Sequence, residues 1–121
     1  MKKQNAIVST NSVDPYHWGR ESLGWHLLDS KALSIIEECV PPGDCEQRHF
    51  HQYSQQFFYV LQGIATIEME GKLMSLRQGE GVHVPARCAH QLFNHEQEDL
   101  RFLVISSPKS HGDRVLAESG E

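Results

Sequence analysis

Three histidines and one glutamine are spaced so that they could bind a divalent transition metal. His49 and His51 are two residues apart, Gln56 follows five residues later, and His90 lies in a second segment punctuated by glycine and proline. On a β-strand, residues i and i+2 point to the same face with their Cα atoms about 6.6 Å apart. Both imidazoles can therefore reach one ion at about 2.0–2.1 Å. Gln56 has the wrong parity for one continuous strand, and a turn at 52–54 would let it face inward.

A shell of three imidazoles and one amide oxygen has definite chemical consequences. Imidazole suits iron, nickel, copper and zinc. Because the amide of Gln56 is neutral, the ion keeps more positive charge than a carboxylate ligand would leave, which makes it a stronger Lewis acid. An amide does not titrate, so Gln56 cannot act as a general base, and the sequence offers no recognisable catalytic base. Cys45 and Cys88 are alternative sulfur donors near the proposed ligands, although a lone cysteine more often packs as a small hydrophobic residue.

Short β-like runs separated by turn residues make up most of the chain. They span residues 25–28, 33–40, 46–50, 56–61, 64–70, 73–76, 81–84, 91–94 and 100–106. Such runs, with turn signals about every 8–12 residues, predict an all-β sandwich or barrel and disfavour parallel βαβ units. Pro85 should end one strand because proline cannot donate to a ladder. Gly71 should supply the positive φ of a hairpin turn at 70–72.

The chain has the size of one domain, so we expect a single domain over residues 1–121 with its barrel core at about 24–106. Residues 107–121 read as a polar tail, in which 115–117 could form one short helical turn or pack on a partner. Trp18 and Trp25 are expected to cover one end of the barrel or a subunit contact. The remaining histidines lack ligand-like spacing: His17, His26, His83, His95 and His111. His83 could approach the site from a neighbouring strand or lie at the surface, and a structural role is favoured; His95 is expected in a solvated turn.

Two blocks of sequence carry a family resemblance. The first has five residues between Gly43 and His49, then His51, four residues to Gln56 and six to Gly63; the second has five residues from Gly79 to Pro85, four to His90 and three to Asn94. These blocks resemble, in order and separation, the motif pair of the cupin superfamily. The resemblance implies a small antiparallel jelly-roll (double-stranded β-helix) barrel whose His49, His51 and His90 bind a metal. Gln56 stands where the first motif usually has Glu, and Arg87 where the second usually has Gly.

The leading functional hypothesis is a metal-dependent enzyme that acts on a small molecule by isomerase- or dioxygenase-type chemistry. The resemblance favours Fe or Mn, and the imidazole-rich shell favours Ni or Zn. The alternative is a non-catalytic cupin that binds a sugar or organic acid and uses the metal as an anchor. Cupins span many activities, and a fold does not determine a function.

Five residues are candidates for a substrate pocket. Phe58, Phe93 and Phe102 could line it, although aromatic residues in a small barrel are more often core. Arg48 and Arg87 flank proposed ligands and could clamp a carboxylate or phosphate with two hydrogen bonds. A surface salt bridge is at least as common a role for each.

Composition narrows the classes of partner. The formal charge is -5 and no Lys/Arg run is longer than Lys2-Lys3, which argues against nucleic acid. No run approaches the ~18 apolar residues of a membrane span, and no apolar signal-peptide core is present. An odd count of three cysteines, at 39, 45 and 88, predicts free thiols in a reducing cytoplasm. The resemblance, together with the need to cover exposed sheet edges, predicts a homodimer.

Overall fold

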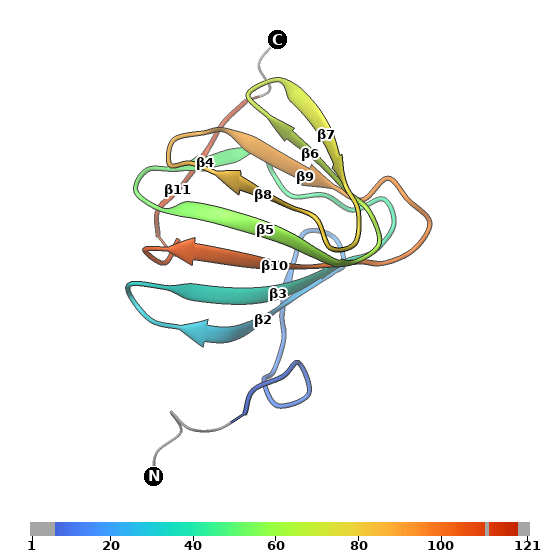
Figure 1. Cartoon of the computed structure of the whole chain (residues 1–121), viewed down its shortest axis with the longest axis vertical. Coiled ribbons are helices and arrows are strands. Elements are labelled where there is room, and N and C mark those ends of the chain that lie inside the picture. The colour runs from blue at the N-terminus through green and yellow to red at the C-terminus, as the bar shows by residue number, and fades with distance from the viewer. Residues whose placement is uncertain (1–6, 111, 119–121) are drawn as a thin grey trace.

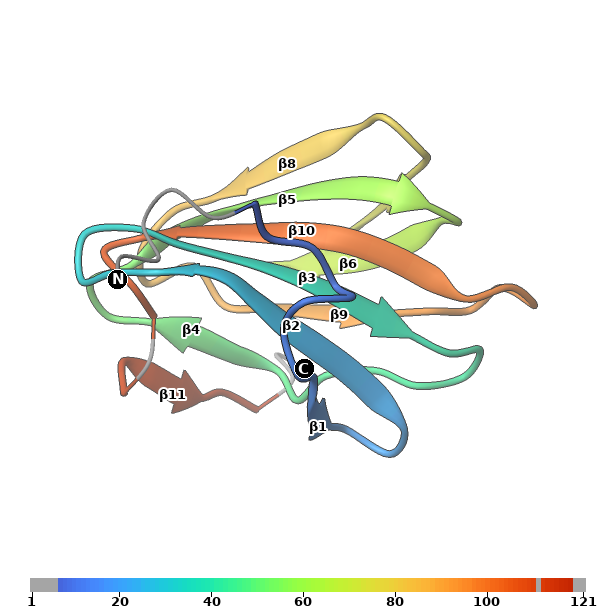
Figure 2. The ribbon, with the colours of Figure 1, turned by 90° about the horizontal axis from the view of Figure 1, so that it is seen from below.

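Two antiparallel sheets face each other in the computed structural model, which describes residues 7–110 and 112–118 (Figure 1). One sheet has the order β1-β2-β3-β10-β5-β8 and the other β11-β4-β9-β6-β7. The strands are β1 (Tyr16–Trp18), β2 (Ser22–Asp29), β3 (Ser34–Val40), β4 (His49–His51), β5 (Gln55–Gln62), β6 (Ala65–Met69), β7 (Lys72–Leu76), β8 (Gly81–Val84), β9 (His90–Phe93), β10 (Leu100–Ser107) and β11 (Arg114–Leu116). Figure 2 shows the two layers edge-on, with β4 and β11 below β2, β3 and β10. The predicted all-β fold is confirmed.

Strand periodicity explains the core between the sheets. On β5 the side chains of Gln56, Phe58 and Val60 are buried, whereas those of Phe57, Tyr59 and Leu61 are exposed, as the alternation predicts. Inward residues of β10 and of β6 complete the interior: Leu100, Phe102, Val104, Ala65 and Ile67. The predicted turn joins β6 to β7 through Glu70 and Gly71, at φ 50° and 87°, which are the positive values a tight hairpin needs.

The tail differs from its prediction. The short helical turn considered for 115–117 is wrong, because β11 forms there and pairs antiparallel with β4. Arg114 lies opposite His51, and Leu116 lies opposite His49. The three-residue β4 would otherwise be an edge strand with unpaired backbone groups. β1 is a second strand without a predicted counterpart, and it pairs with β2.

The described residues contain no helix that could cross a membrane. Trp25 is buried under Arg101, whose guanidinium carbon lies 5.0 Å from the centre of its ring. Trp18 is partly buried against the core. His111 lies outside the described residues.

Candidate metal centre and its cavity

Neighbouring strands bring the three predicted histidines together. His49 and His51 lie two apart on β4 and are buried, and His90 opens β9 directly opposite His49. The centre of the His49 ring lies 4.5 Å from the centre of the His90 ring and 4.9 Å from the centre of the His51 ring. One nitrogen from each ring can be chosen so that the three atoms lie within 4.8 Å of one another. The three histidines are therefore positioned to bind a metal ion.

Hydrogen bonds to backbone carbonyls orient two of these rings. His49 Nδ1 donates to the carbonyl of Gln47 at 2.7 Å, and His90 Nδ1 donates to that of Cys88 at 3.0 Å. A carbonyl only accepts, so each ring keeps its lone pair on Nε2. His90 Nε2 and His51 Nδ1 are buried and have no hydrogen-bond partner among the described residues. Buried polar atoms are rarely left unpaired, and a bound ion would satisfy both nitrogens.

Burial keeps the rings neutral. Burial first, and then the charges of neighbouring groups such as His90 and Arg114, lower the pKa of His49 to about 3 and that of His51 to about 4. Burial also lowers the pKa of His90. Neutral imidazole is the form that binds a metal, so all three rings are ready to ligate at neutral pH.

Gln56 presents its amide oxygen on the same side of the fold. Its Nε2 donates to Ser106 Oγ at 3.0 Å, because β5 and β10 place the two residues opposite each other. Its Oε1 is buried and has no partner among the described residues. The residue lines the same cavity as His49 and His51. A neutral oxygen donor is thus available next to the three nitrogens.

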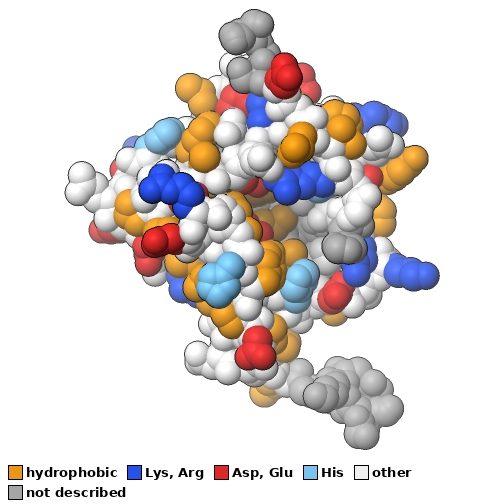
Figure 3. Space-filling view, turned by 180° about the vertical axis from the view of Figure 1, so that it is seen from behind, with side chains coloured by type: hydrophobic (Ala, Val, Ile, Leu, Met, Phe, Trp, Pro, Cys, Tyr) orange, Lys and Arg blue, Asp and Glu red, His pale blue; other side chains and the backbone are white. Residues whose placement is uncertain are grey.

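A cavity of about 200 Å³ opens beside these side chains. Its apolar wall consists of Trp18, Ile36, Phe58 and Val104. Its polar wall consists of Tyr16, Glu38, Glu46, Ser110 and Arg114. Figure 3 views the molecule from the side opposite to Figure 1 and shows this face hollowed near its centre, with basic and acidic side chains around the hollow.

The sequence that contains both motif blocks matches the model of a known protein family. The model of the cupin domain matches residues 36–106, more than half of the chain.

The chain belongs to the cupin family.

Relatives of this cupin have diverse names. An uncharacterized protein of Methanocaldococcus jannaschii is 26% identical over 100 residues, which are 82% of this chain and 80% of that one. Quercetin 2,3-dioxygenase of Bacillus subtilis is 38% identical over 72 residues, 58% of this chain but only 21% of that enzyme. A predicted oxalate decarboxylase from Thermotoga maritima has a similar structure, with a TM-score of 0.79 and 23% identity over 85% of this chain and 99% of that one. The structural likeness at this identity concerns the fold.

Of the five residues predicted to line a substrate pocket, only Phe58 lines the cavity of this cupin. Phe102 lies behind it in the core, with ring centres 5.7 Å apart. Phe93 instead stacks on His95, at 5.0 Å between ring centres. The placement of Phe93 follows from strand parity, because it has the opposite parity to His90 on β9.

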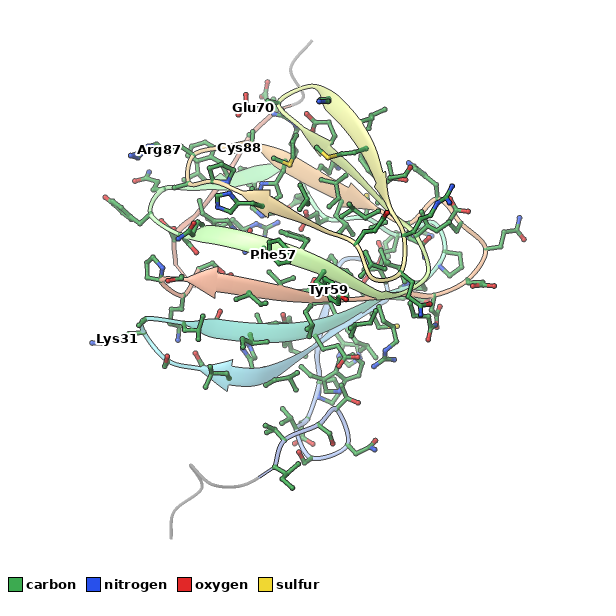
Figure 4. The ribbon with its side chains drawn as sticks, viewed as in Figure 1. Lys31, Phe57, Tyr59, Glu70, Arg87 and Cys88 are labelled. Atoms are coloured by element: carbon green, nitrogen blue, oxygen red, sulfur yellow. The ribbon has the colours of Figure 1, made fainter. Side chains whose placement is uncertain are left out.

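The two arginines also lie away from the cavity. Arg48 forms a two-point ion pair with Glu68, at 2.7 and 3.0 Å, on the outer side of β4. It precedes His49, so strand alternation already directs it to the opposite face. Arg87 is exposed in a loop at φ 68° and reaches the carbonyl of Gln52 at 3.4 Å. Figure 4 shows it pointing away from the molecule.

The other candidate ligands stay outside the cluster. The three cysteines are free, and Cys88 packs against the core. His83 is exposed, with Nε2 2.9 Å from Gln55 Oε1. His26 stacks on Tyr16, at 5.0 Å between ring centres. None of these residues belongs to the cluster of possible ligands found in the described chain.

No catalytic base was recognisable in the sequence, but the cavity lining includes two carboxyl groups. Glu38 accepts a hydrogen bond from Tyr16 at 3.2 Å, and burial raises its pKa to about 7 despite that bond and the charge of Arg114. Glu46 accepts one from the Leu92 amide at 3.0 Å, and burial and the nearby Glu38 raise its pKa well above its usual value. Glu38 can therefore exchange a proton near neutral pH, and Glu46 keeps its proton to a higher pH than an exposed carboxyl group does.

Proposed function

We propose that this cupin is a metal-dependent enzyme that acts on a small molecule, with His49, His51, His90 and Gln56 as the metal ligands. The observation that carries the proposal is the cluster of three buried histidines, with one nitrogen of each within 4.8 Å of the others, beside a cavity that His49, His51 and Gln56 line. On an iron, manganese or nickel ion with six ligands, four protein ligands would leave two positions for substrate oxygens, whereas zinc, which usually takes four ligands, would have to add a fifth.

The donor set fits Fe, Mn, Ni or Zn. When bound, such an ion supplies Lewis acidity to a substrate carbonyl, or redox chemistry if it is iron. The residues of the chain itself would exclude water and transfer protons. Trp18, Phe58 and Val104 give the cavity an apolar lining that excludes water, and Glu38 and Glu46 in the same lining can hold or release a proton. Isomerase-type chemistry uses such proton movement, and the likeness to quercetin 2,3-dioxygenase supports dioxygenase-type chemistry instead.

Metal content tests the proposal directly. Protein purified without added metal is analysed for its elements, stripped with a chelator, and titrated with each of the four ions. We expect one tight site per chain in the wild type and at least a 100-fold weaker site in His90→Ala. His83→Ala is the matched control, since it removes an exposed histidine outside the cluster. Equal affinity in both variants would exclude this centre.

Activity separates the enzyme from the alternative, a non-catalytic cupin that binds a sugar or organic acid. An enzyme loses turnover on chelation and regains it with one ion. A binding protein is stabilised against heat by its ligand without forming product.

We further propose a homodimer. Phe57, Tyr59 and Leu61 are 36–39% exposed along β5 on the outer face of the six-stranded sheet, and Figure 4 shows Phe57 and Tyr59 pointing outward. Exposed apolar groups of this kind suit a subunit contact. Light scattering on the wild type and on Phe57→Ser/Tyr59→Ser measures the mass; a monomeric wild type would refute the proposal.

The cytoplasmic location, a single domain over 1–121 and the lack of nucleic-acid partners stay predictions.

A further inference from the structure

We propose that the cavity takes a small hydroxycarboxylic acid, whose carboxylate binds Arg114 and whose hydroxyl groups bind Glu38 and Glu46. This inference rests on the proposed metal centre and names the class of ligand that would bind beside it. Three sets of observations carry it: an arginine whose guanidinium makes no hydrogen bond to the described residues, two carboxyl groups that each use one oxygen among those residues, and the charge of the cavity.

Arg114 is exposed at the start of β11 and lines the cavity, where its charge acts on Glu38 and Glu46. It lies opposite His51 in the antiparallel register of β11 and β4, and side chains of such pairs share one face of a sheet. Within residues 7–110 and 112–118, no hydrogen bond or ion pair reaches its guanidinium group. A planar guanidinium with five N–H donors matches a carboxylate with two parallel hydrogen bonds.

Asp113 holds Arg114 at this position. Its carboxylate accepts hydrogen bonds from the amides of Gln52, Tyr53 and Ser54, at 3.1, 3.0 and 2.8 Å. These amides belong to the loop between β4 and β5. The contact ties the start of β11 to the strand that carries His51, so the arginine and the metal ligands form one rigid unit.

Glu38 and Glu46 have acceptor capacity to spare. Each uses one oxygen for the protein, since Oε2 of Glu38 binds Tyr16 and Oε2 of Glu46 binds Leu92 N. The other oxygen of each has no hydrogen-bond partner in the described part of the chain. Both residues line the cavity. Hydroxyl groups of a ligand would donate hydrogen bonds to these remaining carboxyl oxygens without adding charge.

The charge of the cavity selects an anion over a neutral ligand. A divalent ion and Arg114 supply three positive charges, and metal-bound histidines are neutral. Glu38 and Glu46 supply at most two negative charges. At least one positive charge is left, which a single carboxylate balances. The volume of about 200 Å³ is below the range of about 300–1,000 Å³ for drug-sized ligands, so the acid must be small.

Isothermal titration calorimetry on the zinc-loaded full chain tests the proposed class of ligand, because it compares the affinities of small molecules that differ in one functional group. The hydroxy acids are glycerate, gluconate and galacturonate. Glycerol, sorbitol and galactose lack the carboxylate, propionate and hexanoate lack the hydroxyl groups, and galactose 6-phosphate carries a dianion. We expect at least one hydroxy acid to bind about 10-fold or more tightly than its counterparts. Absence of such a preference, or a preference for the phosphate, would overturn the proposal.

Variants assign the contacts. Arg114→Gln should weaken the hydroxy acid about 10- to 100-fold, as expected for the loss of a hydrogen bond between charged groups, and should leave the neutral sugar unchanged. Arg77→Gln, which removes an exposed arginine from a loop outside the cavity lining, is the control. Glu46→Gln should weaken the hydroxylated probes but not hexanoate. Equal losses in Arg114→Gln and Arg77→Gln would refute the role of Arg114.

Zinc titrations of the same proteins keep the two proposals distinguishable. A wild type without a zinc site refutes the metal centre. Normal zinc binding without preference among the probes refutes only the inference on the ligand.

Discussion

Replacement of Glu38 by Gln should stabilise the protein at alkaline pH. Glu38 is half-buried in the cavity wall, and burial raises its pKa from 4.5 to about 7. Between these two values the folded state binds more protons than the unfolded state, so the free energy of unfolding falls as pH rises from about 4.5 to 7. Each pKa unit corresponds to about 1.4 kcal/mol, so the ionised group costs about 3 kcal/mol at pH 8.

Glutamine removes this charge without removing the hydrogen bond, because its amide oxygen can still accept from Tyr16. Glu38→Gln should therefore be about 3 kcal/mol more stable than the wild type at pH 8 and equally stable at pH 4.5. Relief of the repulsion between Glu38 and Glu46 acts in the same direction. Titrating groups that are not coupled to Glu38 are common to both proteins and cancel in the difference.

Urea unfolding of the metal-free proteins at pH 4.5, 6 and 8 measures the effect through midpoints and slopes. Glu98→Gln, at an exposed loop position, is the control and should show no comparable gain at pH 8. A wild type as stable as Glu38→Gln at pH 8, or a difference that does not change with pH, would refute the reasoning from burial. A gain of the expected size would mean that the carboxyl group is retained at a cost in stability, as functional groups often are.

Three more predictions follow from the geometry. Because the pKa values of His49 and His51 are about 3 and 4, zinc affinity should hold from pH 7 to 5.5 and collapse near pH 4, measured by competition with a chromophoric chelator; a loss centred at pH 6.5 would contradict the buried, neutral rings. Gly24→Ala should destabilise the fold by about 1–3 kcal/mol, because the added Cβ would lie 2.3 Å from Tyr16 Cζ; urea unfolding that matches the wild type would show that Tyr16 moves freely. Burial opposes ionisation of Asp44, but hydrogen bonds from Ser22 and from the amides of Glu21, Cys45 and Arg20 outweigh it and lower its pKa to about 2, so Asp44→Asn should lose about 2 kcal/mol at pH 7, and this loss should shrink as pH falls from 3.8 to 2, in contrast to a pH-independent packing defect.

Local rules were sufficient for the metal cluster. His49 and His51 share a face because side chains alternate on a strand, and Pro85 follows the last residue of β8 as its missing amide requires. The same rule would have excluded Arg48, which precedes His49 on the strand, and Phe93, which has the opposite parity to His90 on β9. Strand alternation could also have predicted that Glu38 faces the interior, because it shares its parity with Ile36 and Val40, which face the interior.

The amino-acid sequence by itself determined the strands from β2 to β10, the family and the three imidazoles, because periodicity, turn residues and motif spacing act over a few neighbours along the chain. Only the tertiary structure decided what surrounds the imidazoles. Tyr16, Glu38, Glu46 and Arg114 come from four separate segments and meet through the pairing of β1 with β2 and of β11 with β4. Strand pairing between distant segments leaves no period in the sequence, and a charged side chain reads the same whether it faces solvent or an enclosed cavity. The polar residues that line the cavity beside the three histidines can therefore be identified only from the paired sheets.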